Sequence, residues 1–206
     1  MALIKLNNRG VRNVSEFGSV VGGSMTFIKK LTADGSGTSL SFVDGASDVV
    51  LDNTYKEYLF TFKDIHPANN DISFQFNMSA DGGSNYNVTK TTTVFRAYHA
   101  EDDSATALEY RTGPDIAQGT GVQLLISGQG NGNDECLAGT LHLFNPSSTT
   151  FVKHFTTNFT NYHESNITQN YHVAGYGNTT SAVNALQFSF SSGNIDAGDI
   201  CLYGIK

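Results

Sequence analysis

The sequence predicts an all-β protein, an antiparallel β-sandwich of the jelly-roll or lectin-like type. Three observations support this fold class. Short stretches of alternating apolar and polar residues recur along the 206-residue chain, and no stretch shows a sustained helical period. Gly, Asn and Asp separate these stretches at short intervals, as in all-β sandwiches. The composition of 21 Gly, 3 Pro and no Trp, with only 15% charged residues, is typical of a turn-rich β protein.

Residues 1–23 are expected to form an N-terminal arm, and residues 24–206 a single sandwich domain. In the arm, Leu3, Ile4 and Leu6 precede a Gly- and Arg-containing stretch without a sustained period. Such a segment either anchors the domain to a neighbouring subunit or particle, or is a peripheral tail. The start of the chain lacks the apolar core of a signal peptide, and no apolar run approaches the roughly 20 residues that cross a bilayer. A soluble protein made in the cytoplasm is therefore expected.

Short strands are predicted in the first part of the domain. Met25–Leu31 and Ser39–Val43 flank a Gly-rich turn and are expected to pair as a hairpin. Tyr58–Phe62 and Ile72–Met78 alternate apolar and polar residues and are expected to form a meander around a turn at residues 65–71.

The middle of the chain is less regular. Val88–His99 is predicted to be a Thr-rich strand, followed by an acidic loop. The pattern of Ala105–Ile116 is indistinct, and a short helical turn or an irregular excursion is expected there. Val122–Ser127 is predicted to be a strand, and Gly128–Asp134 a polar loop displayed at one end of the sandwich.

The last third of the chain contains the clearest strands. Leu137–Phe144, Thr149–Thr156 and Tyr171–Gly175 are predicted first. Leu186–Phe190 then places its aromatic rings on one sheet face, and the chain is expected to reverse around a turn and return as Asp199–Ile205.

The returning strand carries apolar side chains on both faces. Ile200 and Leu202 lie on one face, and Cys201, Tyr203 and Ile205 on the other. We therefore expect both faces to be covered, either within the sandwich or at an interface between subunits.

Charge and cysteine content exclude some functions. The net charge is −7, from 12 basic and 19 acidic residues, which argues against a nucleic-acid-binding surface. The two cysteines, Cys136 and Cys201, are interpreted as buried free thiols, with a disulfide as the alternative.

No catalytic, cofactor or metal site is predicted. His163 and Glu164 begin like a zinc-protease motif, but Ile167 stands where the second histidine is required. Gly128–Asp134 lacks the Lys-Ser/Thr ending of a phosphate-binding loop. Oxygen ligands in the same region could hold calcium, although a plain turn explains them as well. These ligands would be Asn131, Asn133, Asp134 and Glu135.

Tyrosine, asparagine and histidine residues late in the chain are candidate contacts for a glycan or receptor. Aromatic rings can pack against sugar faces while amides bond the hydroxyls, but the same tyrosines can also be half-buried anchors of strands. The stretch 158–166 is expected to be the best loop for such contacts. The candidates are Asn158, Tyr162, His163, Asn166, Tyr171 and Tyr176.

Several stretches resemble a family of virion structural proteins from marine tailed bacteriophages, and the resemblance covers nearly the whole chain after Gly22. It implies a non-enzymatic β-sandwich displayed on the particle as a capsid decoration, head fibre or tail-associated protein, and it assigns no binding residue. The stretches are Gly23–Lys30, Tyr55–Phe62, Ile65–Asp71, Ser79–Asn87 and Ser192–Ile205.

The leading hypothesis is a virion structural protein that assembles as an oligomer, for which a trimer is one candidate state. Its expected partners are the major capsid or tail proteins. Neither nucleic acid nor a membrane is an expected partner. The alternative is a receptor- or glycan-binding module for host attachment. The residues expected to contribute to assembly are Leu3, Ile4, Leu6, Ile200, Leu202 and Ile205.

Overall fold

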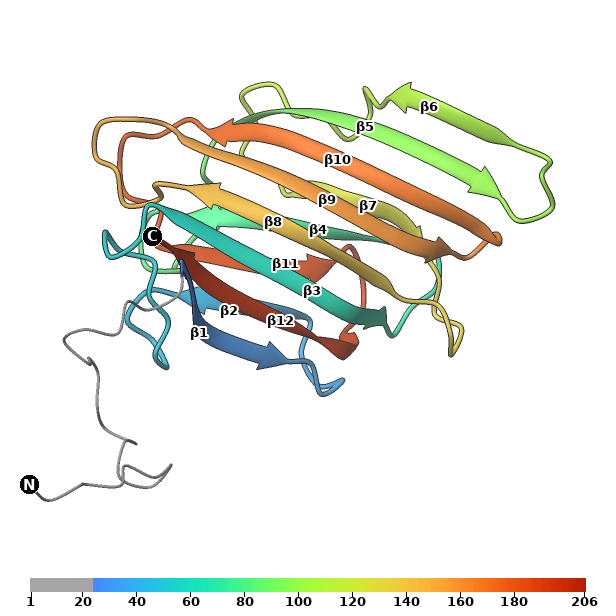
Figure 1. Cartoon of the computed structure of the whole chain (residues 1–206), viewed down its shortest axis with the longest axis horizontal. Helices are drawn as coiled ribbons and strands as arrows, with labels where there is room; N and C mark the ends of the chain where they lie inside the picture. Colours follow the sequence, from blue (N-terminus) through green and yellow to red (C-terminus); the bar gives the residue numbers. More distant parts are fainter. Residues whose placement is uncertain (1–23) are drawn as a thin grey trace, which may run out of the picture.

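The computed structural model describes residues 24–206, which form twelve β-strands and no helix (Figure 1). The predicted arm, residues 1–23, lies outside the described residues. The strands are β1 (Met25–Thr32), β2 (Ser39–Val43), β3 (Glu57–Pro67), β4 (Ile72–Ser79), β5 (Lys90–Ala100), β6 (Thr106–Tyr110), β7 (Gln123–Gln129), β8 (Leu137–Phe144), β9 (Lys153–His163), β10 (Ile167–Gly177), β11 (Ala185–Phe190) and β12 (Ile195–Ile205).

The strands pair antiparallel and form two layers. The larger layer has the order β1-β12-β3-β8-β9-β10-β5-β6, and the smaller layer has the order β2-β11-β4-β7. The layers are joined where Gln129 at the end of β7 pairs with His163 at the end of β9. Figure 1 shows that β5 and β6 extend beyond the smaller layer. The predicted all-β antiparallel sandwich is confirmed.

Most consecutive strands lie in opposite layers, which corrects three predicted pairings. The expected hairpins β1–β2 and β11–β12 and the expected meander β3–β4 do not form, because β1, β3 and β12 pair in the larger layer while β2, β4 and β11 pair in the smaller one. The alternation of side chains indicates which face of a strand is buried, but it does not indicate the partner strand. Crossing from layer to layer is the connectivity of jelly-roll sandwiches.

The predicted apolar faces meet in one aromatic core between the layers. Phe188 of β11 lies 4.9 Å from Phe62 of β3 and 6.3 Å from Phe74 of β4, measured between ring centroids. Phe62 also lies 4.9 Å from Phe159 of β9. All four rings are at most 3% exposed. Burial of such rings is the main driving force for folding, so these contacts fix how the layers stack.

Two expected segments differ from the prediction. Residues 106–110 form strand β6, which pairs with β5, instead of a helical turn. Residues 149–152 form a loop, and β9 begins only at Lys153 and continues to His163. The stretch 158–166 is therefore not a loop: only residues 164–166 form the turn between β9 and β10.

Two lysines are fully buried, and neither forms an ion pair with a carboxylate of residues 24–206. The Nζ of Lys90 donates to Asn77 Oδ1 at 2.5 Å and to the carbonyl of Val88 at 2.9 Å. The Nζ of Lys153 donates to the carbonyls of Phe151 and Thr179 at 2.7 and 3.0 Å. Burial lowers the pKa of both lysines, because desolvation disfavours the charged ammonium.

Candidate functional site

The residues predicted to contact a glycan lie on both faces of the larger layer. Tyr171 and Tyr176 are five positions apart in β10, so their side chains point to opposite faces. Tyr171 is fully buried in the core. Tyr176 faces outward beside His154, with ring centroids 5.9 Å apart. The six candidates therefore do not form the single platform that the sequence suggested.

Four of the candidates, namely Asn158, Tyr162, His163 and Asn166, lie along β9 or in the β9–β10 turn. The hydroxyl of Tyr162 donates to Asn166 Oδ1 at 3.1 Å, and Tyr162 lines a shallow cavity of about 320 Å³. Asn158 lies farther along β9 and accepts a hydrogen bond of 2.6 Å from the amide of Asn170. About eight strand positions, roughly 27 Å, separate Tyr162 from Tyr176 on this face. A single sugar ring cannot contact both tyrosines.

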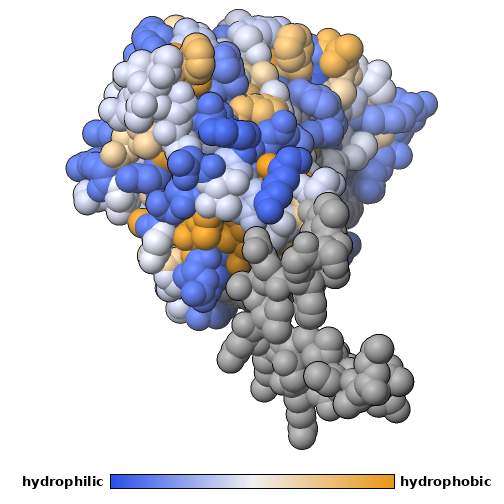
Figure 2. All heavy atoms as spheres, turned by 60° about the vertical axis from the view of Figure 1, so that its left-hand side comes forward, coloured by the Kyte–Doolittle hydropathy of each residue, from blue (hydrophilic) through white to orange (hydrophobic). Residues whose placement is uncertain are grey.

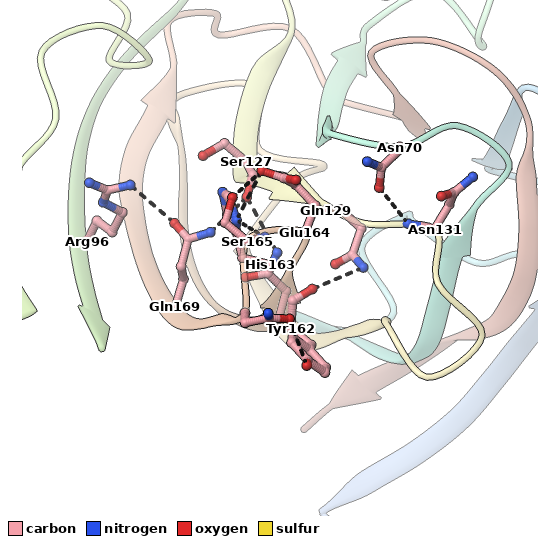
Figure 3. A network of polar contacts seen from close by, with 12 residues as sticks. Asn70, Arg96, Ser127, Gln129, Asn131, Tyr162, His163, Glu164, Ser165 and Gln169 are labelled. Atoms are coloured by element: carbon pink, nitrogen blue, oxygen red, sulfur yellow. Dashed lines mark hydrogen bonds and ion pairs between the residues drawn. The ribbon is translucent and has the colours of Figure 1, made fainter. Parts of the chain in front are cut away.

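His163 holds the junction between the layers. Its ring packs against Gly128, which has a φ of +67° and no side chain to obstruct the ring. The Nδ1 atom of His163 accepts the backbone N–H of Ser165 at 3.0 Å. Figure 3 shows this residue within a network of polar contacts at the end of the sandwich. These contacts give His163 a structural role at the junction between the layers.

A cavity of about 420 Å³ lies along β7, the edge strand of the smaller layer, and we name it the β7 cleft. The segment that follows β6 forms its other wall. Ser127 Oγ and Tyr171 OH lie at its floor, 2.7 Å apart. Because the ring of Tyr171 is fully buried, this hydroxyl is held in place by the core. Tyr171 is the one predicted candidate that lines the cleft.

A chain of polar contacts connects the floor of the β7 cleft to its wall. The carbonyl of Ser127 accepts Gln169 Nε2 at 3.1 Å, and Gln169 Oε1 accepts Arg96 at 3.3 Å, as Figure 3 shows. Arg96 Nε donates to Glu109 Oε1 at 2.9 Å, and Arg111 donates to the same oxygen at 2.9 Å. Strands β7, β10, β5 and β6 therefore orient the polar groups of the cleft together.

The Glu109 carboxyl in this series of polar contacts is ionised near neutral pH. Hydrogen bonding to Arg111, and then to Arg96, lowers the pKa of the Glu109 carboxyl. Glu109 is therefore ionised and remains paired with both guanidinium groups. Arg96 also lies over the ring of Tyr98, with its guanidinium carbon 4.5 Å from the ring centroid.

The wall of the cleft is tied to β5 and β7 by hydrogen bonds. The N–H of Ile116 donates to Thr92 Oγ1, and the N–H of Thr92 donates to the carbonyl of Ile116, both at 2.9 Å. Gln123 Nε2 donates to the carbonyl of Pro114 at 3.1 Å. The cleft is consequently formed before any ligand arrives.

The outer face of the larger layer carries a second surface of interest. Met25, Phe27 and Tyr203 lie near its β1 edge, where Phe27 and Tyr203 have ring centroids 5.7 Å apart. Met25 and Phe27 are 52% and 56% exposed. The strand register places further apolar residues beside them. We name this group the β1-side patch, and it consists of Met25, Phe27, Leu59, Phe144, Tyr203 and Ile205.

A smaller apolar group, the β6-side patch, lies at the opposite edge of the same face and consists of Phe95, Ala97, Leu108 and Tyr110. The rings of Phe95 and Tyr110 are 5.5 Å apart, and Leu108 is 79% exposed. Thr, Asn and His residues of β8, β9 and β10 cover the face between the patches. Figure 2 shows, from another side, a surface on which hydrophilic residues predominate and hydrophobic ones form small groups.

The residues predicted to mediate assembly are separated by the fold. Ile200 and Leu202 are fully buried in the chain's own core, so the expectation that they contact another subunit is wrong. The alternation of β12 explains this, because it turns these two side chains toward the smaller layer. Ile205 has the opposite orientation and belongs to the β1-side patch. Leu3, Ile4 and Leu6 lie outside the described residues.

Two of the four candidate calcium ligands, Asn131 and Glu135, form contacts within the protein. Glu135 Oε2 accepts the N–H of Gly132 at 2.5 Å, and Asn131 Nδ2 donates to the carbonyl of Ala68 at 3.2 Å. Within residues 24–206, no three His, Cys, Asp or Glu residues are grouped in a way that could hold a metal ion.

The cysteines are free thiols, in agreement with the preferred interpretation, but each is half-buried instead of fully buried. Burial raises the pKa of the Cys136 thiol, and the nearby charge of Asp64 adds to this effect.

Comparison with family models, curated proteins and solved structures found no match. None of the elements formed by residues 24–206 is a helix with the length and apolar character needed to span a membrane.

Proposed function

We propose that the protein is a non-enzymatic structural protein of a bacteriophage particle, displayed on the particle surface as an oligomer. The observation that carries this proposal is the β1-side patch, the larger of the two apolar groups on the outer face of the larger layer. Large exposed apolar groups of this kind are typical of surfaces that contact another protein. The resemblance of the sequence to marine phage virion proteins supports the same function.

The composition of the β1-side patch suits a protein contact. Two adjacent rows of the sheet contribute to it: Met25 and Ile205 in one row, and Phe27, Tyr203 and Leu59 in the next. Their side chains lie on one face of the sheet, with Glu57 between Ile205 and Phe144, and a partner can cover several of them at once. Aromatic and Met side chains are enriched at the centres of protein interfaces.

The position of the arm supports the same proposal. Residues 1–23 precede β1, so they join the sandwich at the edge that carries Met25 and Phe27. The proposed partner contacts both the patch and the apolar residues Leu3, Ile4 and Leu6. Contacts at both places would strengthen binding, because the first contact raises the effective concentration of the second within one chain.

The first experiment measures the oligomeric state. Size-exclusion chromatography with multi-angle light scattering compares the full chain with a protein that begins at Ser24, with Phe27→Ser and with Phe151→Ser. Phe151 lies in the β8–β9 loop outside the patch and is 67% exposed, so it is a matched control for Phe27. We expect the full chain and Phe151→Ser to be oligomers and Phe27→Ser to dissociate.

The second experiment measures incorporation into particles. Mass spectrometry of purified phage particles should detect the full chain, and removal of residues 1–22 should prevent its incorporation while the sandwich remains folded by circular dichroism. A full chain that stays monomeric and is absent from particles would refute the proposed function.

A further inference from the structure

We propose that the β7 cleft is a binding site for a neutral saccharide, with room for one or two sugar rings. This inference concerns a surface separate from the β1-side patch and does not depend on the proposed role in a particle. It places ligand binding in the cleft between the layers, away from the outward-facing Tyr162 and Tyr176.

The size and the rigidity of the cleft fit a small ligand. Its volume of about 420 Å³ lies toward the lower end of the range of about 300–1,000 Å³ that is usual for small-molecule sites. Hydrogen bonds from Thr92 and Gln123 hold its wall in place. Binding therefore requires little ordering of the protein, which favours affinity.

The polar groups of the cleft can both donate and accept hydrogen bonds. The partly exposed hydroxyl of Ser127 does both at the floor, where the buried Tyr171 hydroxyl holds it at 2.7 Å. At the wall, Arg111 donates to Glu109 only through NH1, and within residues 24–206 its other guanidinium donors form no further hydrogen bond. Asp115 accepts the Tyr110 hydroxyl at 2.7 Å through Oδ2. Neighbouring donors and acceptors match the vicinal hydroxyls of a sugar.

The net charge of the site indicates a neutral ligand. Of the residues that line the cleft, Arg111 is positive and Asp115 is negative, so their charges balance. Arg96 and Glu109, which pair behind the lining, add one charge of each sign. Glu109 already pairs with both arginines at 2.5 and 2.9 Å. A phosphate or an acidic sugar would have to compete with this carboxylate for the guanidinium groups.

Apolar side chains complete the cleft beside its polar floor. They are Pro114, Ile116, Val122 and Leu124. Val122 is 47% exposed at the rim, where it is available to a ligand. A sugar ring has hydroxyls at its periphery and a C–H face, and the cleft presents partners to both. This combination favours a saccharide over a wholly apolar ligand.

The test titrates the full chain by calorimetry with a set of neutral sugars, namely hexoses, a deoxyhexose and N-acetylhexosamines, and with a hexuronic acid. Two variants alter the cleft. Tyr171→Phe removes only the floor hydroxyl, and Val122→Trp fills the rim at an exposed position. Tyr162→Phe is the matched control, because it removes a tyrosine hydroxyl outside the cleft.

We expect at least one neutral sugar to bind. Tyr171→Phe should weaken its binding about tenfold, because the Ser127 hydroxyl loses the buried partner that orients it toward the ligand. Val122→Trp should abolish binding, and Tyr162→Phe should leave it unchanged. Circular dichroism melts establish that each variant is folded. Absence of neutral-sugar binding, binding of the hexuronic acid alone, or equal binding by Val122→Trp and the unmodified chain would overturn the inference.

Discussion

Replacement of the buried Lys90 by methionine tests the electrostatics of the sandwich most directly. The ammonium of Lys90 is held by Asn77 Oδ1 and the carbonyl of Val88, and no carboxylate in the described part of the chain pairs with it. Methionine has a similar length and no charge, so Lys90→Met removes the charge while it retains most of the packing.

Burial lowers the pKa of Lys90 from 10.5 to about 8. Below pH 8 the lysine is protonated in both the folded and the unfolded chain, and burial of its charge reduces stability by about 3 kcal/mol. Between pH 8 and 10.5 the unfolded chain binds the proton more tightly, so stability rises with pH. Above pH 10.5 the electrostatic penalty is absent. Methionine removes this pH dependence and leaves the Val88 carbonyl without its donor, at about 1–3 kcal/mol.

The assay is urea unfolding monitored by circular dichroism from pH 7 to pH 10 for the unmodified chain, Lys90→Met and the control Lys63→Met. Lys63 has a side chain that is 70% exposed, so its replacement should have little effect. Relative to the unmodified chain, Lys90→Met should lose about 2–3 kcal/mol of stability as the pH rises from 7 to 10. A difference that stays constant over this range would refute the reasoning, whatever its value at pH 7.

Two further predictions concern the core and the junction of the layers. Phe188→Ala should reduce the free energy of unfolding by about 3–5 kcal/mol, because five core phenylalanines have ring centroids within 6.3 Å of its own. The control Phe151→Ala should change the free energy of unfolding by less than about 0.5 kcal/mol. Gly128→Ala should lower the melting temperature more than Gly82→Ala in a thermal melt, since both glycines have a positive φ but only Gly128 would place its Cβ against the His163 ring. Equal effects of the two glycine substitutions would contradict a role for the His163 contact.

The sequence identified the buried faces of the strands more reliably than their partners. Leu186, Phe188 and Phe190 are buried as their alternation predicted. The same alternation is compatible with a partner on either edge, so it could not show that β11 pairs with β2 and β4 instead of β12. Long-range packing between the layers decides these pairings.

The β7 cleft could not be predicted for a different reason. Ser127, Gln169, Arg96 and Glu109 come from four strands and are brought together only by strand pairing. Each of these residues alone is unremarkable in the sequence. The separation of Tyr171 from Tyr176, in contrast, follows from their odd spacing in a single strand and could have been inferred once the strand was recognised.

The unequal widths of the two layers explain how one fold provides two separate surfaces. The larger layer extends past the smaller one through β5 and β6 (Figure 1), and Arg96 and Glu109 lie opposite each other in these two strands. They pair with each other and, through Gln169 and Arg111, shape the cleft beside β7. The outer face of the same layer carries the β1-side patch, where Met25 and Phe27 are 52% and 56% exposed. A sandwich built in this way can present its outer face to an assembly while the cleft stays accessible to a ligand.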